Sequence, residues 1–148
     1  MTHYAGEQIR ASHFFDMISF TPTIANYGTA TFTTNSGVYV RIGDLVWTNI
    51  YIVVGNVGSG TSNVTIEMPA EVPISRSRRQ MLPANSEGGF ATTGNLTGCL
   101  VSFTSGSGAI WDRIRLTNNS GSDALENVTG ADLRAGMILC VEGVYRSY

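Results

Sequence analysis

Apolar and polar side chains alternate along residues 27–69, and this is the clearest pattern in the chain. Val38, Val40 and Ile42 are separated by single residues of other types, and a second series with the same period follows at residues 64–68. β-Branched and aromatic residues that alternate in this way between turn signals are typical of strands with one face on a core. The pattern predicts a half-buried antiparallel sheet.

Turn residues divide the chain into short segments. We expect a turn at residues 35–37, a bulge at residues 43–44 and a glycine-rich turn at residues 55–61. Further strands are expected at residues 90–93, 96–104, 109–116 and 137–145, with one helical turn at residues 131–136. About eight short strands separated by glycine turns predict an all-β fold, an antiparallel β-sandwich or jelly roll.

Residues 1–20 differ from the rest of the chain because they lack β alternation. Four large apolar side chains of this region fall on one side of a short helical or extended segment: Ile9, Phe14, Phe15 and Ile18. So short a segment cannot bury an apolar face alone, and it must dock on its own domain, on a sister subunit or on a larger assembly. We predict an attachment or oligomerisation segment over residues 1–20, with these side chains as its contacts, and a β-sandwich domain over residues 21–148.

The composition favours a single domain with a weakly charged surface. Of the 148 residues, 43% are apolar and only 14% are charged, against an average of about 25% charged in soluble domains. A net charge of −2 gives no field that would gather nucleic acid or acidic lipid. The start of the chain lacks a secretory signal, and no run approaches the ~20 apolar residues of a membrane span. We expect a cytoplasmic product that binds no nucleic acid and inserts into no membrane.

The two cysteines, Cys99 and Cys140, both stand in apolar, strand-like runs. Nothing indicates an oxidising compartment, and the chain is long enough to fold without a bridge. We therefore expect buried free thiols, while the sequence leaves a cross-strand disulfide between them open.

No arrangement of chemistry-bearing residues supports catalysis, a metal or a cofactor. The glycine-rich run at residues 55–60 has a superficial likeness to a phosphate-binding loop, but a strand follows it in place of a helix and the chain has no lysine. His13 and Asp16 would share one helix face, which supplies two metal ligands and no closed site. The carboxylates of the type used in glycoside hydrolysis lie in no distinctive motif: Glu67, Glu71, Glu87, Asp112 and Glu126. We predict a protein that is not an enzyme and uses no cofactor.

Two surface features remain as candidates for binding. Arg76, Arg78 and Arg79 form the one charge cluster, which would contact an acidic partner, a phosphate-bearing polymer or nucleic acid, or would lie in a solvated loop, which we favour. Trp47 and Trp111 have the flat faces that stack on sugars. A sandwich of this size needs large aromatics in its interior, so we expect core packing for both tryptophans.

Residues 31–46 read Thr-x-Thr-x-x-Ser-Gly-x-Tyr-x-Arg-Ile-Gly-Asp-x-Val, and residues 58–69 read Gly-Ser-Gly-Thr-Ser-x-x-x-Ile-x-Met-Pro. Together with the opening residues 5–12 and the closing residues 141–147, these motifs resemble the β-sandwich domains of tailed-bacteriophage virion proteins: fibre and spike tips, head fibres and capsid decorations. The resemblance covers most of the chain. It departs at Ala70, where the family usually has an aromatic residue, and with residues 1–20 alone before the β body no long shaft is expected.

The resemblance implies a homotrimer that joins other virion proteins during assembly in the cytoplasm of a bacterial host. The leading interpretation is a tail-fibre or tail-tip component that displays a trimeric sandwich for host adhesion, with a host surface glycan as a candidate receptor. The alternative is a capsid-decoration or head-fibre protein that stabilises the head. A carbohydrate-binding or carbohydrate-active module is a second alternative, because sandwiches host many such functions.

Overall fold

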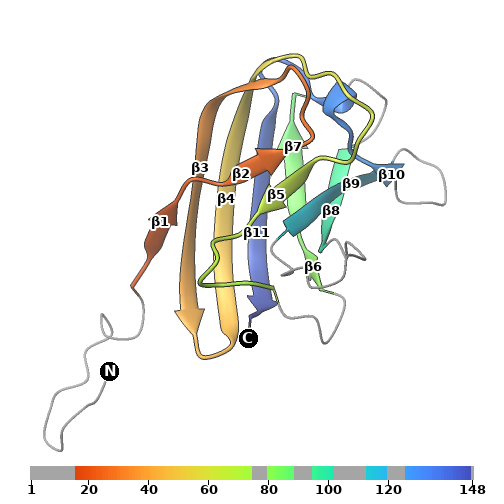
Figure 1. The fold of residues 1–148 in the computed structure, drawn as a ribbon. Helices are drawn as coiled ribbons and strands as arrows, with labels where there is room; N and C mark the ends of the chain where they lie inside the picture. Colours follow the sequence, from red (N-terminus) through yellow and green to blue (C-terminus); the bar gives the residue numbers. More distant parts are fainter. Residues whose placement is uncertain (1–15, 75–79, 89–94, 102–112, 120–125, 148) are drawn as a thin grey trace, which may run out of the picture.

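The computed structural model describes residues 16–74, 80–88, 95–101, 113–119 and 126–147. Within these ranges the chain forms eleven strands and one 3₁₀ turn, and no α-helix. The strands make two antiparallel sheets that pack face to face (Figure 1). This confirms the predicted all-β sandwich, and the strands outnumber the prediction because several are only two or three residues long.

Sheet A has the strand order β1-β3-β4-β11-β7. Its strands are β1 (Ile18–Phe20), β3 (Thr31–Ile42), β4 (Leu45–Asn56), β11 (Ile138–Arg146) and β7 (Ala84–Glu87). The central strands are long, since β3 and β4 have 12 residues each and β11 pairs with β4 along all 9 of its residues. Three long neighbouring strands therefore form the body of sheet A, and short strands form its two edges.

Sheet B has the order β2-β5-β9-β8-β6, with β10 paired to β9. Its strands are β2 (Thr23–Ala25), β5 (Thr65–Glu67), β9 (Arg113–Asn119), β8 (Asn95–Val101), β6 (Met81–Leu82) and β10 (Glu126–Asn127). The chain crosses between the sheets at Pro83, because Leu82 pairs with β8 of sheet B and Ala84 pairs with β11 of sheet A. Proline has no N–H group to leave unpaired at such a crossing. The strands predicted at residues 96–104 and 109–116 are confirmed in their described parts, which belong to β8 and β9, although β9 continues to Asn119. The strand predicted at 90–93 lies outside the described residues.

The core lies between the two sheets and is built from alternate residues of the strands. From β4 it takes Val46, Ile50, Ile52 and Val54, each at most 1% exposed. β11, sheet B and the adjoining loops contribute further buried residues: Leu139, Val141, Val64, Ile66, Met68, Val72, Ile74 and Leu82. Burying such an aliphatic side chain stabilises the fold by roughly 1.5–3 kcal/mol relative to leaving it in water. The apolar series read at residues 64–68 and along the last strand thus faces the core, as predicted.

Tyr145 anchors the end of β11 in this core. Its side chain is 1% exposed, and its hydroxyl donates a hydrogen bond to the carbonyl oxygen of Val72 at 2.7 Å. Burial raises the pKa of Tyr145, Tyr39 raises it further, and Arg41 lowers it. The phenol is therefore held neutral, with its polar atom satisfied by a backbone partner.

Gly43 and Asp44 form the turn of the hairpin between β3 and β4. Ile42 pairs directly with Leu45, and the φ angle of Gly43 is 62°. A two-residue type II′ hairpin turn takes glycine at its first central position, because φ is positive there. Arg41 supports the turn by donating from Nε to the carbonyl oxygen of Gly43 at 2.9 Å. The predicted bulge at residues 43–44 is therefore wrong, because the strand ends here and the chain reverses.

Residues 35–37 lie inside β3, so the turn predicted there is also wrong. Gly37 pairs with Phe20 of β1, and a Cβ atom on Gly37 would lie 2.5 Å from the Phe20 ring. The same ring meets Tyr39 edge-on, with the ring centroids 6.0 Å apart. A glycine in this strand makes room for an aromatic ring from the neighbouring strand.

Several loops cross closely at the end of the sandwich opposite the β3–β4 hairpin, which we name the glycine-loop end. A Cβ atom on Gly58 would overlap the carbonyl oxygen of Gly130, and one on Gly28 would overlap the carbonyl oxygen of Ser59. Only glycine permits backbones to approach this closely. The glycine-rich run at residues 55–60 thus serves the packing of loops.

The predicted helical turn is present as a 3₁₀ turn at Gly130–Asp132, also at the glycine-loop end. The Asp132 carboxylate accepts hydrogen bonds from the backbone N–H and the hydroxyl of Thr129, at 2.8 and 2.7 Å. This local pairing fixes the loop that leads into β11.

Both ends of the described sandwich lie at the hairpin end. Ile18 is opposite Tyr39, closer to the β3–β4 hairpin than Phe20 is. On the C-terminal side, the N–H of Ser147 donates to the carbonyl oxygen of Asp44 at 2.7 Å. Figure 1 shows the C-terminus beside the hairpin. The chain therefore enters and leaves the described sandwich opposite the glycine-loop end.

Candidate functional site

The outward side chains of β3, β4 and β11 form the candidate site. Along these strands, buried residues alternate with residues that point away from the core. The strand register places the outward residues side by side in rows across the sheet. We name this set the outer face of sheet A, and it comprises Thr34, Ser36, Val38, Val40, Ile42, Leu45, Trp47, Asn49, Tyr51, Val53, Ile138, Cys140, Glu142, Val144 and Arg146.

Apolar side chains dominate the rows at the hairpin end. Val40, Trp47 and Val144 lie in one row, and Ile42, Leu45 and Arg146 lie in the next. The exposed fraction is 54% for Val144, 52% for Ile42 and 43% for Leu45. Scattered apolar residues are normal on a protein surface, whereas contiguous large ones mark a surface that contacts another molecule.

A hydrogen-bonded polar pair occupies the middle row. Asn49 donates from Nδ2 to Oε2 of Glu142 at 3.2 Å, and Val38 completes the row. In the following row Tyr51, which is 38% exposed, lies beside Cys140. Glu142 and Arg146, both of β11, carry opposite formal charges on this face, and Glu87 of β7 adds a second carboxylate beside Ile138.

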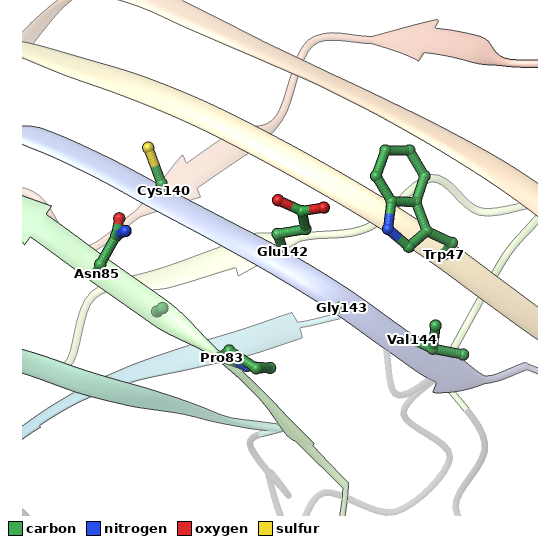
Figure 2. A pocket seen from close by; sticks show the side chains of 8 residues that line it. Trp47, Pro83, Asn85, Cys140, Glu142, Gly143 and Val144 are labelled. Atoms are coloured by element: carbon green, nitrogen blue, oxygen red, sulfur yellow. The ribbon is translucent and has the colours of Figure 1, made fainter.

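A shallow depression of about 570 Å³ borders the outer face where β7 leaves sheet A. Figure 2 shows Trp47, Cys140 and Glu142 projecting from β4 and β11 to the same side of the sheet. Asn85 of β7 lies across from them. The depression forms because β7 pairs only with the first half of β11, so the second half has no neighbouring strand on that side.

Cys140 carries a free thiol on this face and is half-buried. Burial raises its pKa, and the carboxylates of Glu87 and Glu142 raise it further. The thiol is therefore held in its neutral form, which reacts slowly. The prediction of a free thiol is confirmed for Cys140, but the side chain lies on the outward face of β11 and not in the core.

Of the predicted attachment contacts, the described residues include Ile18. It belongs to β1 and is 45% exposed at the edge of sheet A. Sheet A thus begins inside the segment of residues 1–20. The other predicted contacts lie outside the described residues: Ile9, Phe14, Phe15, Arg76, Arg78 and Arg79.

Trp47 corrects the prediction that both tryptophans pack in the core. It is half-buried on the outer face of sheet A, because Val46 and Thr48 are the neighbours in β4 that turn inward. Trp111 lies outside the described residues. The sequence does contain a signal for this face, since β4 is apolar at outward as well as inward positions, a pattern typical of strands covered on both sides.

The carboxylates considered for glycoside hydrolysis are distributed over different elements. Glu67 lies in β5 of sheet B and Glu87 in β7 of sheet A. Glu67 borders a second depression, of about 370 Å³, together with Phe20 and Pro69. Asp112 lies outside the described residues. In the part of the chain that the structure describes, no three His, Cys, Asp or Glu side chains gather where they could hold a metal ion.

No protein-family model, curated protein or solved structure matches the chain. Function is therefore inferred from the fold, from the outer face of sheet A and from the motifs of the sequence. Among the described residues, no helix is long and apolar enough to cross a membrane.

Proposed function

We propose that this chain is a non-enzymatic structural protein of a tailed-bacteriophage virion, and that it serves as a trimeric β-sandwich for host adhesion at a tail fibre or tail tip. The observation that carries the proposal is the outer face of sheet A. This surface presents contiguous apolar side chains at the hairpin end, and a chain that worked alone would leave them in water at a cost of ~25 cal/mol per Å² of apolar area. Burial inside an assembly removes that cost. The resemblance of residues 31–46 and 58–69 to virion sandwich domains supplies the class of assembly.

The position of the chain ends supports a displayed sandwich. The chain enters the described domain at the hairpin end, where Ile18 of β1 lies. Attachment through the preceding residues would leave the glycine-loop end pointing outward. The backbones there are packed closely at Gly58 and Gly130, so the displayed loops have a fixed shape.

The residues that carry the resemblance also have roles in the fold. Gly37 accommodates Phe20, and Gly43 forms the hairpin turn. Arg41 donates hydrogen bonds to the carbonyl oxygens of Gly43 and Glu71, both at 2.9 Å. These structural roles explain why sandwiches of one architecture would share such a motif. They support the fold more directly than they support binding to a particular receptor.

A capsid-decoration or head-fibre protein is the alternative within the same class. It would use the same attachment segment and the same oligomeric sandwich, and it would stabilise the head in place of binding a host. The location of the chain in the particle distinguishes the two roles.

Removal of the N-terminal segment tests the proposal. Residues 1–15 should be deleted, because a longer deletion would remove Ile18–Phe20 and with it the pairing of β1 to β3. We expect a folded sandwich that is not incorporated into particles. A second variant keeps the full length of the chain and changes Ile9, Phe14 and Phe15 to serine. It should lose incorporation to the same degree, because it lacks the same apolar contacts. Normal incorporation of either variant contradicts the attachment role.

A carbohydrate-binding module is the second candidate, and one observation favours it. Trp47 and Tyr51 present aromatic rings on the outer face, with Asn85 and Glu142 nearby as polar groups. Aromatic faces and a few placed polar groups are what a small-ligand site needs. Titration calorimetry with host glycans, using the wild type and Trp47→Ala, tests binding. Polymer cleavage that is lost on changing Glu67, Glu87 or Asp112 to alanine would overturn the non-enzymatic proposal.

A further inference from the structure

We propose that a depression on the side of the sandwich binds a neutral sugar residue of a saccharide. The proposal rests on the proposed function, host adhesion, and it names the site and the class of ligand. The depression, which we name the side depression, has a volume of about 370 Å³, and its lining includes Phe20, Thr21, Thr23, Glu67, Pro69 and Ala70.

The side depression lies where an edge of each sheet comes together. β1 is an edge strand of sheet A and β2 is an edge strand of sheet B, and both belong to the stretch of chain at residues 18–25. Ile24 and its partner Ile66 are buried in the core, so the adjacent pair of Thr23 and Glu67 points away from it. Among the described residues that line the site, none belongs to the outer face of sheet A. An assembly that covers only that face therefore leaves the side depression open.

Three polar side chains line the side depression. Thr23 lies directly opposite Glu67 across the β2–β5 pair, and Thr21 lies in the connection between β1 and β2. Both threonines are exposed, and each hydroxyl can donate and accept hydrogen bonds. The Glu67 carboxylate has about four acceptor positions, so it can accept hydrogen bonds from a ligand in addition to those from the protein.

Hydrogen bonds from sheet A hold both walls of the side depression. In one wall, Asn35 donates from Nδ2 to the carbonyl oxygen of Pro22 at 2.6 Å, which holds the connection between β1 and β2. In the other wall, Arg41 donates from Nη1 to the carbonyl oxygen of Glu71 at 2.9 Å, one residue beyond Ala70. A site whose walls are already ordered loses little conformational entropy when a ligand binds.

Phe20 supplies much of the apolar surface of the site. Its ring lies against Gly37 and meets Tyr39 edge-on, with the ring centroids 6.0 Å apart, so its position is set by β3. Pro69 adds apolar surface, and the small side chain of Ala70 leaves the depression open. An apolar surface with a few placed polar groups suits a sugar ring, whose C–H groups pack on the first while its hydroxyls bond to the second.

The charge and the size of the site select among ligands. The Glu67 carboxylate accepts hydrogen bonds from sugar hydroxyls and repels an anion, so an acidic sugar or a phosphate-bearing polymer is disfavoured. A purely apolar ligand would remove the same carboxylate from water without giving it a partner. A volume of about 370 Å³ lies near the lower end of the range of about 300–1,000 Å³ for small-ligand pockets, which suits one or two sugar residues.

Nuclear magnetic resonance of the full-length chain tests the proposal. The amide signals are followed while D-glucose, D-galactose, L-rhamnose or N-acetyl-D-glucosamine is added, and D-glucuronic acid is the acidic probe. We expect at least one neutral sugar to shift the signals of residues 20–23 and 67–70, with a dissociation constant of about 1–10 mM, as suits so small a ligand. D-Glucuronic acid should not shift them.

Two substitutions with matched controls identify the groups that bind. Glu67→Gln keeps the shape of the side chain and should weaken binding about tenfold, because charge-assisted hydrogen bonds to the sugar are lost. Ala70→Tyr fills the depression and should abolish binding. Glu87→Gln and Ala135→Tyr are the controls, because Glu87 and Ala135 are exposed and lie outside the side depression. Both controls should leave the dissociation constant unchanged, and thermal unfolding checks that every variant folds.

The outcomes separate this proposal from the proposed function. It is overturned if no neutral sugar shifts these signals, or if Glu67→Gln and Glu87→Gln bind the sugar equally well. Shifts confined to Trp47, Asn85 and Glu142 assign the sugar to the outer face of sheet A and also overturn it. The virion role is decided separately, by incorporation of the chain lacking residues 1–15.

Discussion

Asn49 donates a hydrogen bond to Glu142 at 3.2 Å between two neighbouring strands, in the middle row of the outer face of sheet A. A charged group at such a place lowers the affinity of the face for an apolar partner, and the amide reduces that cost by satisfying one carboxylate oxygen. The pair therefore links the local structure of β4 and β11 to the strength of assembly.

Removing the amide should weaken self-association. In Asn49→Ala the Glu142 carboxylate enters the interface without its donor, so we expect the dissociation constant to rise about tenfold, as measured by sedimentation velocity. In a Glu142→Gln background the same substitution should have a much smaller effect. Equal effects of Asn49→Ala in both backgrounds would show that the hydrogen bond does not influence association.

Alanine at Gly58 should destabilise the sandwich strongly. Its Cβ atom would overlap the carbonyl oxygen of Gly130 and would lie 2.9 Å from that of Tyr27, and both are backbone atoms that cannot rotate away. We expect the free energy of unfolding to fall by about 3 kcal/mol, measured by chemical denaturation.

Gly136→Ala is the control for this effect. Gly136 has a φ of 80°, but no atom lies within 4 Å of the position that a Cβ atom would take, so only backbone strain of about 1 kcal/mol should result. Equal losses for Gly58→Ala and Gly136→Ala would mean that the close packing of the loops contributes nothing to stability.

Tyr145→Phe should change stability in a way that depends on pH. At pH 8 the variant loses the hydrogen bond to Val72, and we expect unfolding to become easier by about 1–2 kcal/mol. The pKa of Tyr145 is raised in the folded state from its ordinary value of 10.0, mainly by burial. A raised pKa contributes stability that is fully present below pH 10 and is lost as the pH rises toward the folded-state pKa.

The difference between wild type and Tyr145→Phe should therefore shrink above pH 10, by about 1.4 kcal/mol per pH unit at most. Denaturation of both proteins at pH 8 and pH 11, at one chain concentration, measures this. A difference that stays constant or widens over that range would contradict a buried, neutral phenol.

Local alternation was enough to predict the sandwich and the inward residues of β5 and β11. In β3 it was misleading, because the alternating residues Val38, Val40 and Ile42 face outward and Tyr39 faces the core. Turn chemistry was less informative. The predicted turn at residues 35–37 fails because Gly37 accommodates Phe20, a residue far from it in sequence, and a contact of that kind leaves no local trace. The hairpin at Gly43 is local, and Gly-Asp between two apolar strands is a signal that favours a turn over a bulge.

The candidate site was only partly predictable. The aromatic side chain of Trp47 indicated burial, but it did not indicate on which side of the sheet Trp47 would lie. That side depends on which alternate residues of β4 face the core. The apolar residues at outward positions, Leu45, Tyr51 and Val53 among them, do indicate that β4 is covered on both faces. What covers the outward face is a property of the assembly, which a single chain does not specify.

The most direct test of the proposed function is electron microscopy of intact particles that carry the chain. We predict density for three sandwiches at the tail fibre or tail tip, with the outer faces of their A sheets turned toward one another and the glycine-loop ends pointing outward. Density on the capsid would assign the decoration role and retain the assembly. Particles without the chain, or single sandwiches with Trp47 and Val144 facing solvent, would contradict the proposal.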